Sequence, residues 1–196
     1  MHAHTFIECV RLNRCNAAIL DALPDLGLPD AMLVGGCLFQ TVWNVKSGKA
    51  PDADIKDYDL FYFDASDLSA EAETAINIRI AQQFADLGVE IEVANQARVH
   101  LWYESHFGQR RAPLRSVKEG VDGFLMPCTC VGISVDPARR AQLYAPHGLE
   151  DLYNGVVRLN PWIDQPELFA RKAASYLGRW PWLRVQERSV TIPSTQ

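Results

Sequence analysis

A pair of glycines that separates a short apolar run from a helical pattern places the strongest constraint on the fold. Residues 32–34 are apolar, Gly35 and Gly36 follow, and apolar side chains then recur at helical spacing over residues 38–43. This order predicts a strand, a tight turn and a helix. Because the first amides of a helix have no helical partner and its dipole is positive there, the backbone N–H groups of Gly35, Gly36 and Cys37 suit a phosphate. A glycine pair in this position can also serve only as a tight turn.

The segment at residues 55–64 alternates polar and apolar side chains, which predicts a strand. Asp57 and Asp59 then project side by side from one face, and large apolar side chains lie on the other. Two carboxylates so close repel each other unless a cation lies between them, and Mg²⁺ is usually held by one or two carboxylates together with substrate phosphates. A solvent-facing strand side is the alternative interpretation for this pair taken alone.

Residues 89–93 repeat this alternation and predict a third strand that presents Glu90 and Glu92 to one side. Glu92, or less readily Glu90, would add a third carboxylate next to Asp57 and Asp59. Three carboxylates beside a phosphate-binding turn are typical of a site for two-metal nucleotidyl transfer. The spacing leaves the choice between the two glutamates open.

The remaining elements complete an α/β (α+β) prediction, with a small mixed sheet flanked by helices. The sequence indicates one domain over residues 1–188, whose part from about residue 136 wraps the core, and a flexible tail at 189–196. The other elements expected are a helix from a Thr5/Glu8 capping box to Leu23, a helix capped by Ser69 that ends at Gly88, a strand at 124–135 and a helix over 171–177.

Charge and cysteine content exclude several functional classes. With 19 Lys+Arg against 24 Asp+Glu among 196 residues, the net charge of −5 argues against nonspecific binding to duplex DNA. The five cysteines have no regular spacing, so reduced cytoplasmic thiols are expected, with Cys128 and Cys130 as half-buried strand residues rather than a zinc site. The longest apolar run, residues 31–39, is about half the length of a membrane span, so no membrane anchor is expected.

The charges are unevenly distributed along the chain. Residues 1–90 hold 14 acidic and 6 basic side chains, whereas residues 91–196 hold 10 acidic and 13 basic ones. This asymmetry suits a site in which carboxylates hold cations and basic groups hold phosphates, although a solvated surface would have the same pattern.

Further candidates follow the third strand along the chain. We expect Arg98 and His100 to alternate on its continuation, on the face of Glu92, where they could contact phosphate or acceptor, with a structural role as the alternative for His100. A basic segment either clamps an anionic acceptor or lies in solvent: Arg110, Arg111, Arg115 and Lys118. Two polar residues are expected to hold backbone at the strand end, and two tryptophans to close the core: Asn95, Gln96, Trp180 and Trp182.

Three stretches of the chain, residues 34–44, 56–64 and 95–103, resemble the bacterial nucleotidyltransferase-like proteins of the DNA polymerase beta superfamily, a little-characterised group. Weaker likeness continues at 148–152, 172–176 and 179–182. The resemblance implies a polymerase-beta-like fold, in which Gly35 and Gly36 bind the triphosphate, Asp57 and Asp59 bind the metals and Glu92 takes the third acidic position.

The chain departs from these relatives at specific positions. The superfamily often has Ser as the second turn residue and Asp as the third acid, where this chain has Gly36 and Glu92. Residues 34–37 also resemble the opening of CCA-adding enzymes, which carry Arg-Asp where this chain has Phe39 and Gln40.

The combined expectation is a metal-dependent nucleotidyltransferase. It would move NMP from an NTP to the hydroxyl of an unidentified acceptor, a small molecule, RNA or protein, and release pyrophosphate. One Mg²⁺ (or Mn²⁺) on Asp57, Asp59 and Glu92 would activate the hydroxyl, and a second on the two aspartates would steady the pyrophosphate. The alternative is a non-catalytic module on the same fold that binds a nucleotide or a partner.

Overall fold

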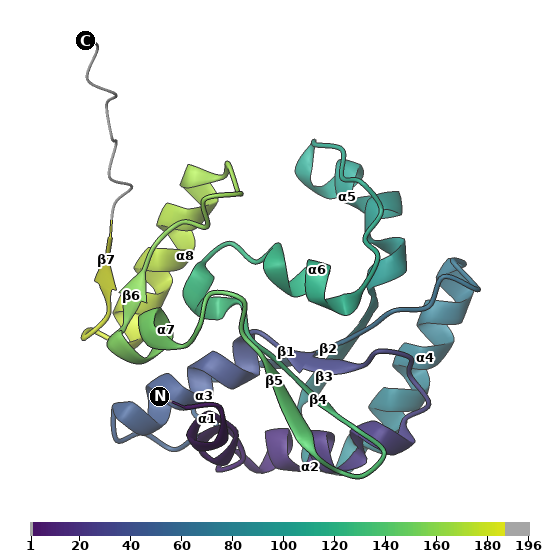
Figure 1. Ribbon diagram of the computed structural model, residues 1–196, viewed down its shortest axis with the longest axis horizontal. Coiled ribbons are helices and arrows are strands. Elements are labelled where there is room, and N and C mark those ends of the chain that lie inside the picture. The colour runs from purple at the N-terminus through teal and green to yellow at the C-terminus, as the bar shows by residue number, and fades with distance from the viewer. Residues whose placement is uncertain (1, 187–196) are drawn as a thin grey trace.

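The computed structural model describes residues 2–186 and centres on a five-stranded mixed sheet (Figure 1). The strand order is β3-β2-β1-β4-β5, and β2 runs parallel to β3 while the other neighbours are antiparallel. A separate short parallel ladder joins β6 to β7. The strands are β1 (Met32–Val34), β2 (Asp57–Tyr62), β3 (Glu90–Asn95), β4 (Gly132–Val135), β5 (Ala141–Tyr144), β6 (Val156–Val157) and β7 (Arg184–Val185).

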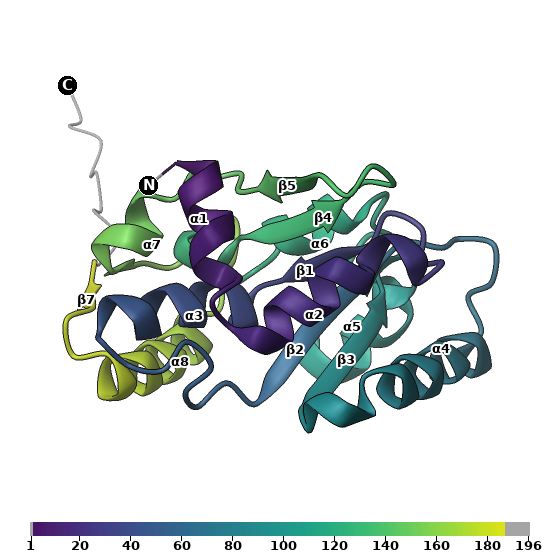
Figure 2. The same ribbon diagram turned by 90° about the horizontal axis from the view of Figure 1, so that it is seen from below.

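Helices cover both faces of this sheet, which confirms the predicted class. In Figure 1, α1 and α2 lie below the sheet and α5, α6 and α8 above it; Figure 2, seen from below, shows α4 beside β3 and α3 next to α8. The helices are α1 (Ala3–Val10), α2 (Arg14–Ala22), α3 (Gly36–Lys46), α4 (Ala70–Gln83), α5 (Val99–Phe107), α6 (Val117–Asp122), α7 (Glu150–Asn154) and α8 (Pro166–Arg179). No helix within residues 2–186 has the length and apolar character needed to cross a membrane.

The strand that carries the two aspartates forms where periodicity predicted it. In β2 the apolar side chains of Tyr58, Leu60 and Tyr62 are buried, while Asp57 and Asp59 lie half-buried on the opposite face. This alternation turns the two carboxylates away from the core, toward the face that carries α5, α6 and α8.

The two caps predicted for the helix before β3 are also present. The Ser69 Oγ accepts a hydrogen bond from the Ala72 N–H at 3.2 Å, which satisfies one of the free amides that begin α4. Gly88 has φ +67° and ends the short 3₁₀ helix Ala85–Leu87 that follows α4.

The N-terminal prediction of one helix opened by a Thr5/Glu8 capping box is wrong. Helix α1 begins at Ala3, so Thr5 lies inside it, and the chain breaks before α2. The break occurs because Asn13 is a strong cap: its Oδ1 accepts from the N–H groups of Cys15 at 2.9 Å and Asn16 at 3.4 Å. The same fully buried side chain donates to Tyr58 Oη at 3.0 Å, which ties this cap to β2.

The strand predicted at 124–135 is shorter than expected. Only residues 132–135 form β4, because Pro127 begins a 3₁₀ helix over Pro127–Thr129. Cys128 and Cys130 therefore lie outside any strand, although both are buried. The hairpin strand β5 was not predicted, and α8 extends beyond the predicted 171–177 in both directions.

The C-terminal part of the chain packs on α3 through two tryptophans, which were predicted to close the hydrophobic core. Trp180 is fully buried with its ring centroid 5.1 Å from that of Trp43, and its Nε1 donates to Asn44 Oδ1 at 2.9 Å. Trp182 Nε1 donates to Ser47 Oγ at 2.9 Å. The tail predicted at 189–196 lies outside the described residues.

Candidate functional site

The glycine turn forms one wall of the site, at the junction of β1 and α3. Gly35 has φ +62°, which favours glycine, and an ideal Cβ there would lie only 3.1 Å from the Phe124 ring. Its N–H donates to Val131 O at 2.9 Å, so this amide is not free for a ligand, contrary to the expectation for it. Within residues 2–186, the N–H groups of Gly36 and Cys37 make no hydrogen bond, and they begin α3. The Cys37 side chain is fully buried, so only its amide is available.

Asp59 of β2 lies close to this turn, and the acids of β3 lie next to those of β2. Asp59 Oδ2 lies 3.9 Å and 3.8 Å from ideal Cβ positions on Gly35 and Gly36. In the parallel ladder Asp59 is paired with Glu92, and Asp57 with Glu90. The register thus sets the acids of the two strands next to each other.

Of the two glutamates left open by the sequence, Glu92 is the one that lines a cavity together with Asp59. Within residues 2–186, no three His, Cys, Asp or Glu side chains are grouped closely enough to hold a metal ion together. Asp57, Asp59 and Glu92 are therefore neighbours on the sheet and not a preformed three-ligand centre.

Burial, followed by mutual repulsion, raises the pKa values in this carboxylate set. The pKa of Asp59 is raised to about 7, first by burial and then by the charges of Asp57 and Glu92, while Lys172 opposes the rise. The pKa of Glu92 is also raised, by burial and then by Asp57 and Glu90. At neutral pH the protein thus holds a partly buried carboxylate close to its protonation midpoint, which a nearby cation would stabilise in the charged form.

A cavity of about 210 Å³ lies between the glycine turn, β2 and α8. Lys172 and Tyr176, one turn apart on α8, form the wall opposite Gly36 and Asp57. The pKa of Tyr176 is raised to about 12, chiefly by burial, so its hydroxyl stays protonated and can donate a hydrogen bond. The other residues that line this cavity are Gly35, Phe39, Gln40, Asp59, Phe124, Leu125, Met126 and Thr129.

A second cavity, of about 400 Å³, adjoins the first and lies between α5 and α8. The two share Asp59, Lys172, Phe124 and Leu125. The second cavity also contains Glu92 and a set of rings and one guanidinium from several elements: Phe61, Trp102, Tyr103, Phe107 and Arg111. It can therefore enclose a larger and less polar group than the first.

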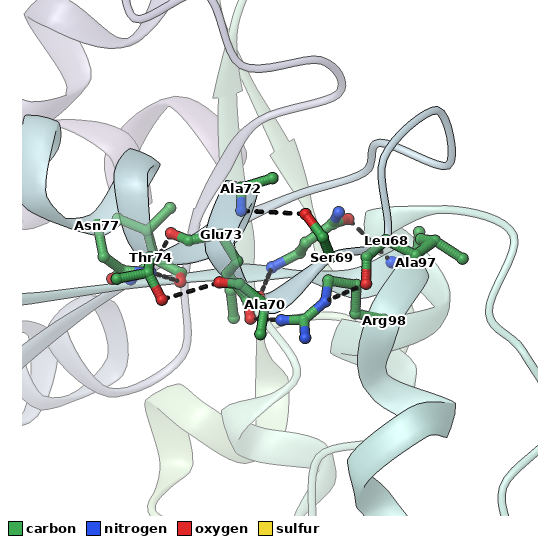
Figure 3. A network of polar contacts seen from close by, with 12 residues as sticks. Leu68, Ser69, Ala70, Ala72, Glu73, Thr74, Asn77, Ala97 and Arg98 are labelled. Carbon is green, nitrogen blue, oxygen red and sulfur yellow. Dashed lines mark hydrogen bonds and ion pairs between the residues drawn. The ribbon is translucent and has the colours of Figure 1, made fainter.

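Arg98 and His100 do not continue the β3 strand, so that prediction is wrong. Asn95 ends the strand because its Oδ1 accepts from the Ala97 N–H at 3.1 Å and caps a 3₁₀ turn over Gln96–Arg98. Arg98 instead pairs with Glu73 of α4 and donates through Nε to Leu68 O at 2.9 Å (Figure 3). His100 falls in α5, and neither residue lines either cavity. The prediction that Asn95 holds the backbone at the strand end is thereby confirmed.

One residue of the basic segment at 110–118 reaches the site. Arg111 lines the second cavity, with its guanidinium 5.1 Å from the Tyr103 ring centroid. The other three have partners elsewhere: Arg110 with Glu104 at 3.2 Å, Arg115 with Glu119 at 2.8 Å and Lys118 over the Tyr144 ring at 5.4 Å.

Sequence reasoning missed Gln40, Lys172 and Tyr176 as site residues. Lys172 and Tyr176 stood in a segment of weak family likeness, and their spacing of four on a helix is the one signal that could have linked them. Gln40 lies one helical turn after Gly36, so it shares the face of α3 on which the turn opens.

The sequence profile of a family described as Nucleotidyltransferase matches residues 21–185. The chain belongs to this nucleotidyltransferase family. A solved structure described as "The NMR structure of the protein reveals a CCA-adding enzyme head domain" is 26% identical, with a TM-score of 0.77 over 95% of this chain and 96% of that one. The family and this match support a general nucleotidyl transfer role and an enzymatic function for the chain.

A second solved structure shows the same fold in a longer protein. It is described as a tRNA-processing enzyme in an apo form, is 20% identical and gives a TM-score of 0.54. The match covers 87% of this nucleotidyltransferase and 43% of that chain. No curated protein matches this nucleotidyltransferase by sequence.

Proposed function

We propose that this nucleotidyltransferase moves NMP from an NTP to an acceptor hydroxyl, with divalent metal ions held at Asp57 and Asp59 and with release of pyrophosphate. The observation that carries the proposal is the position of these two carboxylates: they project from β2 into the same cavity as Gly36, whose free amide begins α3. Donors for phosphate and acceptors for a cation thus share one small space.

In this proposal the triphosphate lies in the first cavity, between the two walls. The N–H groups of Gly36 and Cys37 donate to phosphate oxygens from one side, at the positive end of α3. Lys172 and the Tyr176 hydroxyl contact the phosphates from α8. A phosphate that contacts Lys172 in this cavity also lies near Asp59. The phosphate and the carboxylate repel each other unless a cation compensates the carboxylate charge.

The donor set fits a magnesium or manganese ion. Both prefer oxygen ligands, and magnesium is commonly held by one or two carboxylates together with substrate phosphates, which is what Asp57 and Asp59 offer here. When bound, the ion supplies Lewis-acid stabilisation of phosphate charge. The raised pKa of Asp59 supports this assignment, because its causes are burial and the negative charges beside it. Glu92 is proposed as the third acid.

The acceptor hydroxyl enters in this proposal through the second cavity, where Asp59 and Glu92 meet its apolar walls. The 26%-identical structure is described as a CCA-adding enzyme head domain, which makes tRNA the first acceptor to test. Small molecules, other RNAs and proteins follow in the same assay, because this chain has Phe39 and Gln40 where CCA-adding enzymes carry Arg-Asp.

The test combines nucleotide binding with transfer. Thermal unfolding with each of ATP, GTP, CTP and UTP, with and without Mg²⁺ or Mn²⁺, should give a metal-dependent rise in Tm that is absent in Asp57→Asn/Asp59→Asn. A ligand at 100 times its Kd stabilises by about 2.7 kcal/mol, which such a scan detects. The nucleotide identified is then used, labelled at the α-phosphate, with the acceptor panel.

Two outcomes would change the proposal. If no NTP shifts the Tm with either metal, the proposal fails. If an NTP binds with metal but no acceptor becomes labelled while pyrophosphate is never released, the alternative of a nucleotide-binding module replaces it. The exposed Asp86→Asn is the control for a general effect of removing a carboxylate.

A further inference from the structure

Gln40 is a buried polar side chain that no other residue satisfies. It is 8% exposed and lines the first cavity. Its Oε1 is buried and has no hydrogen-bond partner. Its Nε2 also makes no hydrogen bond within residues 2–186, but this atom is not among the buried unpaired ones and borders the space at Gly36. Buried polar groups in proteins are nearly always paired, and an unpaired one costs stability, so this amide requires an explanation.

Its neighbours on α3 follow the usual rule. Thr41 Oγ1 donates to Cys37 O at 2.7 Å, and Asn44 Nδ2 donates to Ala53 O at 2.8 Å. Both are as deeply buried as Gln40. Of these three residues, Gln40 is the one with an unpaired buried atom, and it is also the one that lines the cavity.

The Gln40 amide lies directly beside the glycine turn. An ideal Cβ at Gly36 would stand 3.1 Å from Gln40 Nε2 and 3.8 Å from Asp59 Oδ2. Gly36 has no positive φ, so its backbone conformation does not require glycine. Because glycine has no side chain, position 36 leaves an open space in the cavity wall, and the Gln40 Nε2 borders that space.

We propose that Gln40 is a triphosphate-binding residue: its Nε2 donates a hydrogen bond to a phosphate oxygen of the nucleotide, next to the Gly36 and Cys37 amides. The inference rests on the proposed function, since it deepens the assignment of the first cavity to phosphate. It gives the Gln40 Nε2, which borders the cavity without a partner among residues 2–186, an acceptor when the nucleotide is bound. The buried Oε1 is itself an acceptor, so a phosphate does not pair with it.

The residue pair at 36 and 40 then works as a unit. Where a serine at the second turn position would offer a hydroxyl, this chain has no side chain at Gly36 and brings the Gln40 amide to the same place. An amide is neutral, so it adds a donor beside Asp57 and Asp59 without adding to their negative charge. A carboxylate at position 40 would add to it.

The test measures binding of three probes, an NTP, inorganic tripolyphosphate and the matching nucleoside, in Mg²⁺ by Tm shift and calorimetry. For Gln40→Ala we expect affinity for NTP and for tripolyphosphate to fall by the same factor, about tenfold, as for one hydrogen bond to a charged group. Nucleoside affinity should not change. The exposed Gln83→Ala on α4 is the matched control and should bind all three as wild type does.

Three further variants separate binding from structure. Gln40→Met keeps the volume and removes the unpaired amide, so its Tm without ligand should equal or exceed that of wild type while tripolyphosphate affinity falls. Gln40→Glu should lose more affinity than Gln40→Ala, because it places a carboxylate against the phosphates. Gly36→Ser/Gln40→Ala should recover part of the loss, because the serine hydroxyl occupies the vacated space.

The failures of the two proposals are distinguishable. If wild type binds NTP with Mg²⁺, Asp57→Asn/Asp59→Asn does not, and Gln40→Ala binds tripolyphosphate as wild type does, the role of Gln40 is overturned and the proposed function stands. Equal loss for nucleoside and tripolyphosphate in Gln40→Ala would also overturn it. If wild type binds no NTP, both proposals fail.

Discussion

Acidic side chains lie on both sides of β3, and their surroundings differ. On the α4 side, Glu73 pairs with Arg98, and the two side chains are 20% and 11% exposed. Glu73 Oε1 also accepts from the Asn95 N–H at 2.7 Å, and Arg98 Nε donates to Leu68 O at 2.9 Å (Figure 3). Each charged end is satisfied by the protein itself.

On the other side, Asp57, Asp59 and Glu92 have no comparable partners. Lys172 is the one basic residue that opposes the raised pKa of Asp59. Within residues 2–186, no basic side chain forms an ion pair with any of these three carboxylates. Removing one partner of a buried ion pair is costly because it leaves an uncompensated charge, whereas carboxylates without a basic partner remain available to a cation. The predictions below test this difference, beginning with the largest effect.

Asp57→Asn should reduce metal-dependent transfer by at least about 10²–10³-fold. The variant loses a carboxylate proposed to hold the metal ion, and that ion would stabilise the negative charge that develops on the phosphate during transfer. Labelled-NTP transfer and pyrophosphate release measure the effect. The Tm without ligand should not fall, since one of the repelling charges is removed. Retention of the wild-type rate by Asp57→Asn would contradict the assignment.

Arg98→Ala should lower the free energy of unfolding by about 3–5 kcal/mol, because Glu73 would be left buried and unpaired. Urea unfolding measures this, with Arg110→Ala as the control. The Arg110–Glu104 pair has side chains 88% and 59% exposed, so its loss should cost less than about 1 kcal/mol. Equal losses in the two variants would remove the contrast drawn above.

Lys172→Met should weaken NTP binding by about tenfold, because a cation that faces the phosphates is lost. The pKa of Asp59 should rise further in this variant, since Lys172 opposes its rise. Calorimetric titration with NTP and Mg²⁺ measures the affinity. Arg171→Met, the exposed neighbour on α8 that lines neither cavity, should bind as wild type does.

The pH dependence of stability should carry the signature of Asp59. Because its folded pKa of about 7 lies above the usual value of 3.8, the contribution of Asp59 to stability is fully present below pH 4 and is lost as the pH rises through 7. In chelator the Tm of wild type should therefore decline by roughly a few degrees across this window relative to Asp59→Asn. Added Mg²⁺ should raise the Tm more at pH 8 than at pH 5. A pH-independent Mg²⁺ effect would speak against metal binding by Asp59.

The sequence predicted those parts of the site that depend on local periodicity. Alternation placed Asp57 and Asp59 on the face away from the core, and the glycine pair placed the start of α3. It could not predict the wall formed by Lys172 and Tyr176, because the approach of α8 to the sheet depends on contacts between segments far apart in the chain. The same limit hid Gln40, whose burial beside the cavity is visible only in the folded structure.

Two of the wrong predictions have a common physical cause. The helix predicted from Thr5 and the strand predicted to continue to His100 were each extended across a buried asparagine that interrupts the element. Asn13 caps α2, and Asn95 caps the turn after β3, each through side-chain hydrogen bonds to backbone N–H groups. Periodicity records which face is apolar but not which polar side chain interrupts the backbone.

The aromatic contacts between α3 and α8 have a consequence for binding entropy. Phe39 and Trp43 of α3 meet Tyr176 of α8 with ring centroids 5.6 Å and 5.5 Å apart, and Trp180 at the end of α8 packs on Trp43. The two walls of the first cavity are thus held at a fixed separation by the folded core. A nucleotide that binds there does not have to order them, so more of its interaction energy is available as affinity. Tyr176 thus has two parts in this arrangement: its ring fixes the separation of the walls, and its hydroxyl is placed to meet a ligand in the cavity.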